Sequence, residues 1–353
     1  MVHSELLSSD AHAPNPSVAK ADRIPERQAT VIPAIEHKWR FREGKFLNTR
    51  EQWLYYCSYF PSAGTPLRGV VLFLHGIGEY SRRFAHVFDV LCASGFGVIA
   101  YDLVAHGRSE CETVGARAHA LGFQHFVDDT NTFLDFAHQS ILPTVVGAEA
   151  AAALPLVLMG MSYGTLVGLH TVLSERHAVA AIVLAAPAVS VEWTRELQFQ
   201  ALFMRPIAML FPWARITPGV NYAYLSRDPS FVQDFLSDPL IVTEKLTARM
   251  ASESLDAMNE IQNDARIDDA QSALCRVPIL ILQGTNDKIT SLALAEHFYD
   301  RLATADKEFK KFEGLYHCIF NEPEKDAVTD HILAWLQQRF PVTKYASSTS
   351  SSS

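Results

Sequence analysis

Residues 155–174 combine a strand, a tight turn and a helix in direct succession, and they read PLVLMGMSYGTLVGLHTVLS. The run PLVLM is apolar throughout, which is typical of a strand buried on both faces of a sheet. Gly160 and Gly164 lie two residues before and two residues after Ser162. Because glycine has no Cβ atom, both positions relieve the crowding of a sharp turn. We therefore predict a strand–turn–helix unit with Ser162 at the turn.

Outward from this unit, short apolar runs alternate with helical patterns. The predicted strands are residues 53–60, 70–74, 97–101, 155–159, 180–185, 278–282 and 309–312. The predicted helices are residues 82–93, 124–140, 163–174, 292–303 and 324–339. Residues 53–60 alternate only weakly and are expected at the outer edge of the sheet. Strands that alternate with helices favour the α/β class, with a mostly parallel sheet covered by helices on both faces.

The alternation divides the chain into regions. Residues 36–188 and 274–342 form the predicted core. Residues 189–273 show only helical and loop signals, and we interpret them as a cap above the carboxyl ends of the strands, where open α/β sheets bind ligands. Residues 1–35 and the serine-rich residues 343–353 have no periodic apolar pattern and are predicted to be disordered.

Composition excludes several classes of function. The chain has 353 residues, of which 48% are hydrophobic and 20% charged, as in an ordinary globular protein. Its net charge of −9 argues against a nucleic-acid partner, which needs a basic surface. The longest apolar run, residues 150–159, is too short to span a bilayer. With five scattered cysteines and no signal-peptide pattern, we expect a cytoplasmic protein with reduced thiols, and peripheral membrane contact stays open.

Three residues form a candidate catalytic triad. The sequence GMSYG around Ser162 matches the nucleophile elbow G-x-S-x-G; the alternative is a tight turn with an incidental serine. Asp287 follows a predicted strand and could orient an imidazole, or else cap the next helix. His317 follows the last predicted strand. The order Ser162, Asp287, His317 is the one expected of an α/β-hydrolase, and each follows a different strand.

A loop after the strand at residues 70–74 reads HGIG and has room to point backbone N–H groups into the site. We assign the N–H groups of Ile77 and Tyr163 to an oxyanion hole. A phosphate loop is excluded, because the third glycine of that pattern is replaced by Ser81. The sequence has no metal-binding His-Glu-x-x-His or Cys-x-x-Cys pattern, so no metal or cofactor is predicted. His75 and His106 are expected to make structural hydrogen bonds.

Six segments in the same order resemble the monoacylglycerol lipase and lysophospholipase group of the α/β-hydrolases, which includes caffeoylshikimate esterases. The resemblance covers residues 53–338. Its motifs are HGIGEYSRRF (75–84), YDLVAHGRSE (101–110), GMSYG (160–164), SDPLIVTEKLTARM (237–250), QGTNDKIT (283–290) and YHCIFNEPEKD (316–326). The resemblance implies an eight-stranded sheet with a helical cap. It also implies Ser162, Asp287 and His317 as catalytic residues, and Ile77 and Tyr163 at the oxyanion hole.

The sequence departs from this group at a few positions near the site. Met161 replaces the usual His before the serine, and Tyr163-Gly164-Thr165 replaces Met-Gly-Gly. Cys318 replaces the usual Glu after the catalytic His, and Ile77 is bulkier than the usual small residue. These changes alter the surroundings of the acyl pocket but keep every backbone N–H group. Cys318 is either a thiol that makes the enzyme sensitive to thiol reagents or a small packed residue.

The resemblance implies a serine hydrolase that acts on a carboxylic ester, either a monoacylglycerol or a lysophospholipid. The alternatives are an esterase for another ester such as a hydroxycinnamoyl ester, a non-catalytic binding protein of the same fold, and a peptidase of related fold. Residues 198–213 are apolar on several helical faces, and such a helix is either buried or meets lipid. We predict that Phe203, Ile207, Leu210 and Phe211 bind the substrate as part of a lid; the alternative is packing onto the main domain. The oligomeric state is left open.

Overall fold

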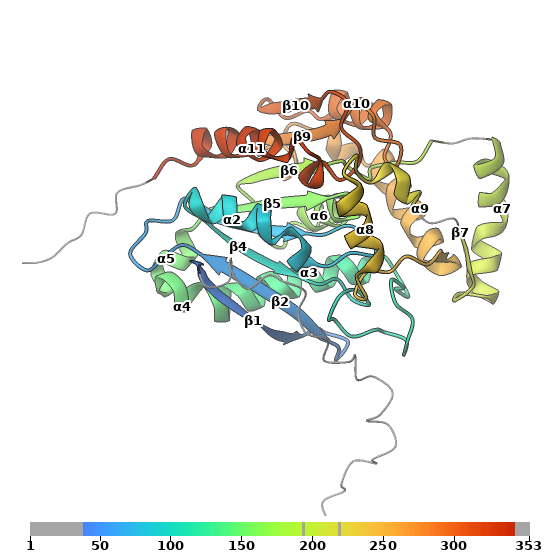
Figure 1. Ribbon diagram of the computed structural model, residues 1–353, viewed down its shortest axis with the longest axis horizontal. Coiled ribbons are helices and arrows are strands. Elements are labelled where there is room, and N and C mark those ends of the chain that lie inside the picture. The colour runs from blue at the N-terminus through green and yellow to red at the C-terminus, as the bar shows by residue number, and fades with distance from the viewer. Residues whose placement is uncertain (1–37, 193–194, 218–219, 343–353) are drawn as a thin grey trace, which may run out of the picture. The chain divides into compact units, whose positions relative to one another are not determined.

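The computed structural model describes residues 38–192, 195–217 and 220–342. The predicted extension at 1–35 and tail at 343–353 lie outside these residues. Eight strands form one sheet in the order β1-β2-β4-β3-β5-β6-β9-β10 (Figure 1). β1 and β4 are each antiparallel to β2, and all the other neighbouring pairs are parallel. The prediction of an α/β-hydrolase fold with a mostly parallel eight-stranded sheet is confirmed.

The five central strands are buried on both faces, as their uninterrupted apolar runs predict. Helices cover both sides of the sheet, so no face of these strands meets water. The strands of the sheet are β1 (Arg40–Leu47), β2 (Trp53–Phe60), β3 (Gly69–Leu74), β4 (Phe96–Tyr101), β5 (Leu156–Met161), β6 (Ala181–Ala185), β9 (Ile279–Gly284) and β10 (Lys307–Phe312).

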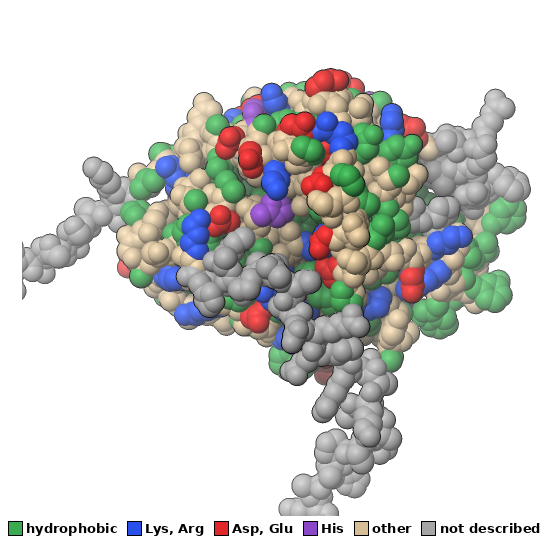
Figure 2. All heavy atoms as spheres, viewed as in Figure 1, with side chains coloured by type: hydrophobic (Ala, Val, Ile, Leu, Met, Phe, Trp, Pro, Cys, Tyr) green, Lys and Arg blue, Asp and Glu red, His purple; other side chains and the backbone are tan. Residues whose placement is uncertain are grey.

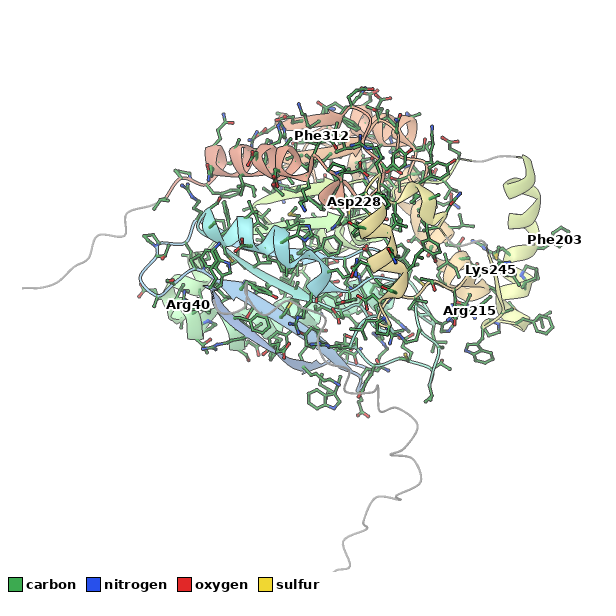
Figure 3. The ribbon with its side chains drawn as sticks, in the orientation of Figure 1. Arg40, Phe203, Arg215, Asp228, Lys245 and Phe312 are labelled. Atoms are coloured by element: carbon green, nitrogen blue, oxygen red, sulfur yellow. The ribbon has the colours of Figure 1, made fainter. Side chains whose placement is uncertain are left out.

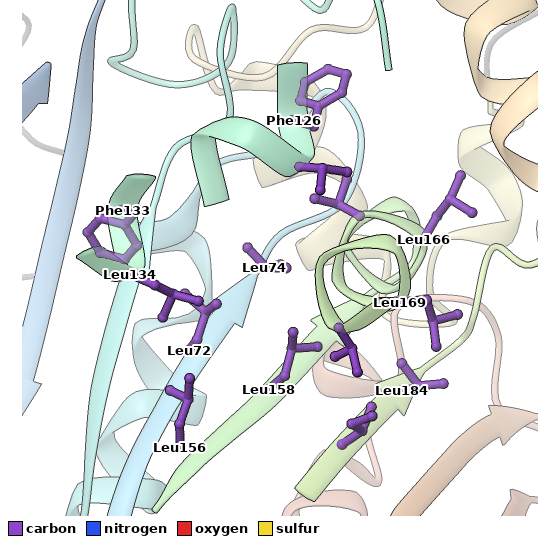
Figure 4. Packing of buried hydrophobic residues seen from close by; sticks show 14 of the residues in the cluster. Leu72, Leu74, Phe126, Phe133, Leu134, Leu156, Leu158, Leu166, Leu169 and Leu184 are labelled. Carbon is purple, nitrogen blue, oxygen red and sulfur yellow. The ribbon is translucent and has the colours of Figure 1, made fainter. Parts of the chain in front are cut away.

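Two apolar clusters hold the layers together, one on each face of the sheet. Along β3, Leu72 and Leu74 point into one cluster and Phe73 into the other, because neighbouring side chains of a strand face opposite ways. The first cluster lies under α3, α6 and α10, and Figure 4 shows part of it. The second lies under α2 and α11. The helices of this core are α2 (Ala85–Ala93), α3 (Gln124–Phe136), α4 (Leu142–Val146), α5 (Ala148–Ala153), α6 (Tyr163–Leu173), α10 (Leu292–Arg301) and α11 (Lys325–Arg339), with short helical turns at η1 (Ser81–Phe84), η2 (Ala137–Ile141) and η5 (Ile319–Asn321).

The expectation that residues 53–60 form an outer strand was wrong. β1 pairs outside β2 over its full length, from Arg40 opposite Phe60 to Leu47 opposite Trp53. The sequence of β1, RFREGKFL, is charged and only Phe46 is well buried, so its apolar signal is weak. A Cβ atom on Gly44 would lie 3.0 Å from the ring of Tyr56, so this glycine makes room for the neighbouring strand.

The chain between β6 and β9 forms a largely helical insertion. α7 packs against α9, and α9 in turn packs against α6 of the core (Figure 1). We expected no strands here, but β7 and β8 form a short antiparallel pair. They have three and two residues, too few to give a periodic pattern in the sequence. The elements are α7 (Arg195–Leu210), β7 (Arg215–Thr217), η3 (Tyr222–Tyr224), α8 (Pro229–Ser237), β8 (Leu246–Thr247), α9 (Ala248–Asn263) and η4 (Ala265–Ile267).

The ends of two insertion helices follow the usual rules of capping. Asp228 accepts a hydrogen bond from the N–H of Ser230 at the start of α8, and Pro229 occupies the first helical position. Thr247 caps α9 in the same way through the N–H of Met250.

Among the described residues, no helix combines the length and apolar character that crossing a membrane requires. The cap boundaries at 189 and 273 stay a prediction.

Candidate active site

Ser162 lies in the sharp turn between β5 and α6. Its backbone adopts φ 53° and ψ −121°, a region that non-glycine residues rarely occupy. A Cβ atom on Gly164 would lie 2.7 Å from the carbonyl oxygen of His75, and one on Gly160 would lie 2.8 Å from the backbone of Gly164. The two glycines therefore let α6 start directly against the loop after β3. This close packing fixes the hydroxyl at the carboxyl end of β5.

The loops after β9 and β10 bring Asp287 and His317 to the same place. Gly284 ends β9, and a Cβ atom there would lie 2.6 Å from the carbonyl oxygen of Tyr316. The histidine loop can therefore cross directly over the end of β9. His317 Nδ1 lies 2.8 Å from Asp287 Oδ2, and His317 Nε2 lies 2.9 Å from Ser162 Oγ. The structure thus joins the three predicted residues, which are 155 positions apart at their extremes, in one chain of hydrogen bonds.

The hydrogen bonds fix the direction of each donor. Asp287 as a carboxylate can only accept, so Nδ1 of His317 carries the proton that lies between them. Nε2 is then free to accept the hydroxyl proton of Ser162. All three residues are buried, with exposed fractions of 9% or less. Such an arrangement can take a proton from a serine hydroxyl in surroundings that exclude most water.

Asp287 is held by a set of donors that the sequence reasoning missed. Its Oδ1 accepts the backbone N–H groups of Ile289 and Thr290, at 2.8 and 3.0 Å. Its Oδ2 accepts the side chains of Gln283 and Thr290, both at 2.8 Å, as well as His317. Burial disfavours the charged form, but the nearby His317 and these hydrogen bonds hold the pKa of Asp287 below its usual 3.8. The carboxylate is therefore ionised.

The structure also decides between the two interpretations of Asp287. The helix that follows, α10, is capped by Ser291, which accepts the N–H of Leu294. Asp287 is therefore not the N-cap of that helix. Gln283 and Thr290 both belong to the segment QGTNDKIT, so a signal was present in the sequence, but residue type alone did not give them a role.

The loop after β3 passes directly beside the serine. A Cβ atom on Gly76 would lie 3.4 Å from the Cβ atom of Ser162. Among the described residues, the N–H groups of Ile77 and Tyr163 donate to no acceptor. Tyr163 is the first residue of α6, where an N–H has no partner within the helix. Both predicted donors are therefore free to bind an oxygen atom that carries negative charge.

His75 and His106 make structural hydrogen bonds, as predicted. His75 Nδ1 donates to the carbonyl oxygen of Gly76 at 2.8 Å, and its Nε2 accepts the N–H of Leu103 at 2.9 Å. Burial lowers the pKa of His75 to about 4, so the ring is neutral and fixes the loop. His106 Nδ1 donates to the carbonyl oxygen of Val104 at 2.9 Å, and burial likewise lowers its pKa to about 3.

Two charged residues of the segment HGIGEYSRRF lie near the site without a predicted role. Glu79 is buried, and burial raises its pKa above the usual value. The guanidinium of Arg83 pairs with Asp234 at 3.0 Å and Asp238 at 2.9 Å, and so joins the loop after β3 to α8. Both residues belong to a motif that is visible in the sequence, but their charge alone did not distinguish them from ordinary surface residues.

Cys318 is a buried thiol next to His317. Its exposed fraction is 3%, and burial raises its pKa well above the usual value. A protonated, inaccessible thiol reacts slowly, which favours the packed-residue interpretation.

No group of three His, Cys, Asp or Glu side chains suited to a metal occurs in the part of the chain that the structure describes.

The predicted substrate-binding side chains lie apart from this site. Phe203, Leu210 and Phe211 are at least half exposed, and Ile207 is partly buried. Figure 3 shows Phe203 on the side of α7 that faces away from the core. Met209, Trp213 and Ile216, in or just after the same helix, are exposed as well. We call Phe203, Met209, Leu210, Phe211, Trp213 and Ile216 the α7 patch, and Figure 2 shows hydrophobic side chains along this edge. The structure does not bring these residues against Ser162.

Comparisons with known proteins identify the family. Residues 65–324 match the protein family described as serine aminopeptidase, S33. The chain belongs to this family. It is 29% identical to the monoacylglycerol lipase of Mycolicibacterium smegmatis, over 77% of this chain and 89% of that protein. It is 25% identical to phospholipase YtpA of Bacillus subtilis, over 76% of this chain and 95% of that protein.

A solved structure agrees with these relatives. The crystal structure of the monoacylglycerol lipase of Paleococcus ferrophilus superimposes with a TM-score of 0.65 and 25% sequence identity, covering 81% of this chain and 99% of that one. The predictions of a monoacylglycerol lipase-like α/β-hydrolase and of a carboxylic ester hydrolase are confirmed at the level of family and enzyme class.

Proposed function

We propose that this hydrolase cleaves monoacylglycerols to fatty acid and glycerol, or lysophospholipids, through Ser162, His317 and Asp287. The observation that carries the proposal is the continuous chain of hydrogen bonds from Ser162 Oγ through the imidazole to Asp287. The names of the relatives, a monoacylglycerol lipase and a phospholipase, support the substrate class.

In the proposed reaction, Ser162 Oγ attacks the ester carbonyl while His317 Nε2 takes its proton. Asp287 holds the imidazole in the correct tautomer and stabilises the positive charge that forms on it. His317 then gives the proton to the leaving glycerol oxygen, and an acyl-enzyme results. Water, deprotonated by the same imidazole, attacks the acyl carbonyl. The bond between Ser162 Oγ and the acyl carbon then breaks, the imidazolium returns its proton to Oγ, and the fatty acid leaves.

The proposed oxyanion hole consists of the N–H groups of Ile77 and Tyr163. Donors of this kind contribute about 2.7–4 kcal/mol each to transition-state stabilisation. Because both are backbone groups, the departures of this chain at positions 77, 163 and 165 do not remove them. The neutral ring of His75, bonded to Gly76 and Leu103, supports this role by keeping the loop in place.

For the insertion at 189–273, we propose a cap that brings the enzyme to lipid. The α7 patch supports this role, because its six exposed apolar side chains all lie within residues 203–216, and groups of exposed apolar side chains mark surfaces that meet lipid or protein. In this proposal Phe203, Ile207, Leu210 and Phe211 meet the acyl chain while it is still in the lipid surface. The contact is transient and peripheral.

The test is a substrate screen with the purified enzyme and with Ser162→Ala as the blank. The substrates are a monoacylglycerol, a lysophospholipid, a hydroxycinnamoyl ester and an amino-acid p-nitroanilide. We expect the highest kcat/KM for one of the two lipids, and no activity in the blank. A higher kcat/KM for the hydroxycinnamoyl ester or the anilide would move the enzyme to the esterase or peptidase alternative. No turnover of any substrate would favour the non-catalytic binding protein.

A further inference from the structure

A short segment of the insertion pairs with the loop that carries His317. The backbone N–H of His317 donates to the carbonyl oxygen of Tyr224 at 3.3 Å, and the N–H of Cys318 donates to that of Leu225 at 2.7 Å. The catalytic histidine of the proposed function is therefore held by the backbone of the insertion as well as by the core. The inference below rests on that proposed role of His317.

The pairing continues past the histidine through side chains. Ser226 Oγ donates to the carbonyl oxygen of Asn321 at 2.9 Å, and it accepts the N–H of Asp228 at 3.0 Å. Residues 224–226 are thus joined to the segment 317–321 by three hydrogen bonds, and the pairing shifts by two residues between Leu225 and Ser226. Figure 3 labels Asp228, which ends this segment and starts α8.

An ion pair anchors the far end of the pairing. Glu322 Oε1 accepts the backbone N–H of Arg227 at 2.8 Å, and Oε2 accepts Arg227 Nε at 2.5 Å. The guanidinium also pairs with Glu324. The side chain of Glu322 is fully buried and that of Arg227 is one-third exposed. A buried carboxylate needs such a partner, because leaving a charge unpaired in the interior is costly.

We propose that Arg227 and Glu322 are positioning residues, which clamp residues 224–228 onto the histidine loop and so hold the imidazole of His317 between Asp287 and Ser162. One carboxylate oxygen of Glu322 accepts the backbone N–H of Arg227, and the other accepts the side-chain Nε–H of Arg227. This two-point contact sets both the distance and the register of the segment. A reacting group displaced by about 1 Å loses about a hundredfold in rate, so a clamp five residues away affects the chemistry.

The test compares Arg227→Met, Glu322→Met and the double variant with the wild type. Arg227→Lys serves as the conservative variant, because it keeps the positive charge beside Glu322 but loses the planar group. Arg215→Met is the matched control. Arg215 also lies in the insertion and pairs with an acid, Glu244, at 2.6 Å. Its guanidinium also donates to the carbonyl oxygens of Lys245 and Arg117, which lie outside the histidine loop.

Two readouts separate positioning from stability. The first readout is kcat and KM on a short soluble ester. The rate is divided by the amount of serine that a fluorophosphonate has labelled when labelling is complete, so that only folded sites are counted. The second is the downfield proton NMR resonance of His317 Nδ1–H, which needs no turnover. We expect Arg227→Met to lower kcat about tenfold to a hundredfold with KM within about twofold, and to broaden or move the resonance.

The remaining variants define the expected pattern. The double variant should be no slower than the slower single variant, because both changes break one contact. Arg227→Lys should fold and recover part of the lost kcat, and Arg215→Met should keep kcat and the resonance. Should Glu322→Met fail to fold, Arg227→Lys and Arg227→Met still decide the question.

Three outcomes would overturn the inference. Arg227→Met with unchanged kcat and resonance but a lower melting temperature would make the ion pair a purely structural anchor. Equal losses in Arg215→Met would show a general effect of removing an insertion ion pair. A wild type that the fluorophosphonate does not label would remove the proposed function itself, and this inference with it; the first two outcomes leave that function standing.

Discussion

Asp287 accepts more hydrogen bonds than a partner of His317 alone would need. Two backbone N–H groups and the side chains of Gln283 and Thr290 bind its oxygens besides the imidazole. These donors keep the carboxylate ionised and aimed at Nδ1 although it is buried. At the scale of the single residue, we therefore predict that position 287 requires the charge of a carboxylate and not only its size.

Replacing Asp287 by Asn tests this requirement. The amide keeps the size of the carboxylate but leaves the imidazole in the wrong tautomer, so kcat should fall by about four orders of magnitude. The measurement is kcat on a soluble ester, with Asp306→Asn as the control. This control removes an exposed ion pair with Arg339 and should keep full activity. A loss of less than tenfold in Asp287→Asn would contradict the assigned role.

The lowered pKa of Asp287 also predicts how stability depends on pH. A carboxyl group whose pKa is lower in the folded state contributes stability above its unfolded pKa, and this contribution is lost as the pH falls through the folded value. The stability that the carboxylate contributes, measured as the difference in unfolding free energy between the wild type and Asp287→Asn, should therefore shrink as the pH falls below about pH 4. Urea unfolding at several pH values measures it. A difference that does not shrink between pH 4 and 2 would contradict the lowered pKa.

The triad could be predicted from the sequence because residue type, order and position after a strand all agree. Ser162, Asp287 and His317 each follow a predicted strand, and parallel strands end at one edge of the sheet. The supporting residues could not be predicted in the same way. Gln283 and Arg227 act through the direction of one side chain, which no periodic pattern encodes.

At the scale of elements, the elbow depends on the close approach of α6 to the loop after β3. Gly164→Ala would place a Cβ atom 2.7 Å from the carbonyl oxygen of His75, so backbone has to move. We expect a loss of about 1–3 kcal/mol in unfolding free energy and a large loss of kcat, since Ser162 is displaced. Gly122→Ala is the control, because its nearest neighbour would be 3.8 Å away. Equal stability of the two variants would show that the elbow tolerates the extra atom.

The interior strands were predictable and the peripheral ones were not. A continuous apolar run such as that of β5 signals burial on both faces, whereas β1 buries little and carries several charged residues. β7 and β8 are too short for any periodicity. The position of each strand in the sheet order, such as β2 inside β1, depends on tertiary pairing that neighbouring residues do not determine.

At the scale of the whole molecule, the exposed α7 patch lies apart from the buried triad. The apolar sequence of residues 198–213 left open whether this helix packs or meets lipid. In the structure Met204 and Ala208 are buried, whereas Phe203, Leu210 and Phe211 are exposed. One helix therefore both packs and presents an apolar surface, and only the fold shows which side chains do which.

Replacing Phe203, Leu210 and Phe211 together by Ser should reduce activity on a long-chain monoacylglycerol in vesicles about tenfold or more, because these side chains no longer enter the lipid. Activity on a short soluble ester should change less than twofold, since the triad is elsewhere. Both rates and vesicle co-sedimentation are measured. Val114→Ser, an exposed apolar residue outside the patch, is the control. Equal losses on both substrates would contradict a lipid-facing role of α7.

The site of covalent labelling by a fluorophosphonate, read by peptide mass spectrometry, tests directly whether Ser162 is the nucleophile that His317 activates. We predict that the wild type is modified at Ser162 and nowhere else, and that Ser162→Ala is unmodified. His317→Ala should be modified at least about a hundredfold more slowly, because the hydroxyl has lost its base. Labelling of a different residue, or an unchanged rate in His317→Ala, would contradict this prediction.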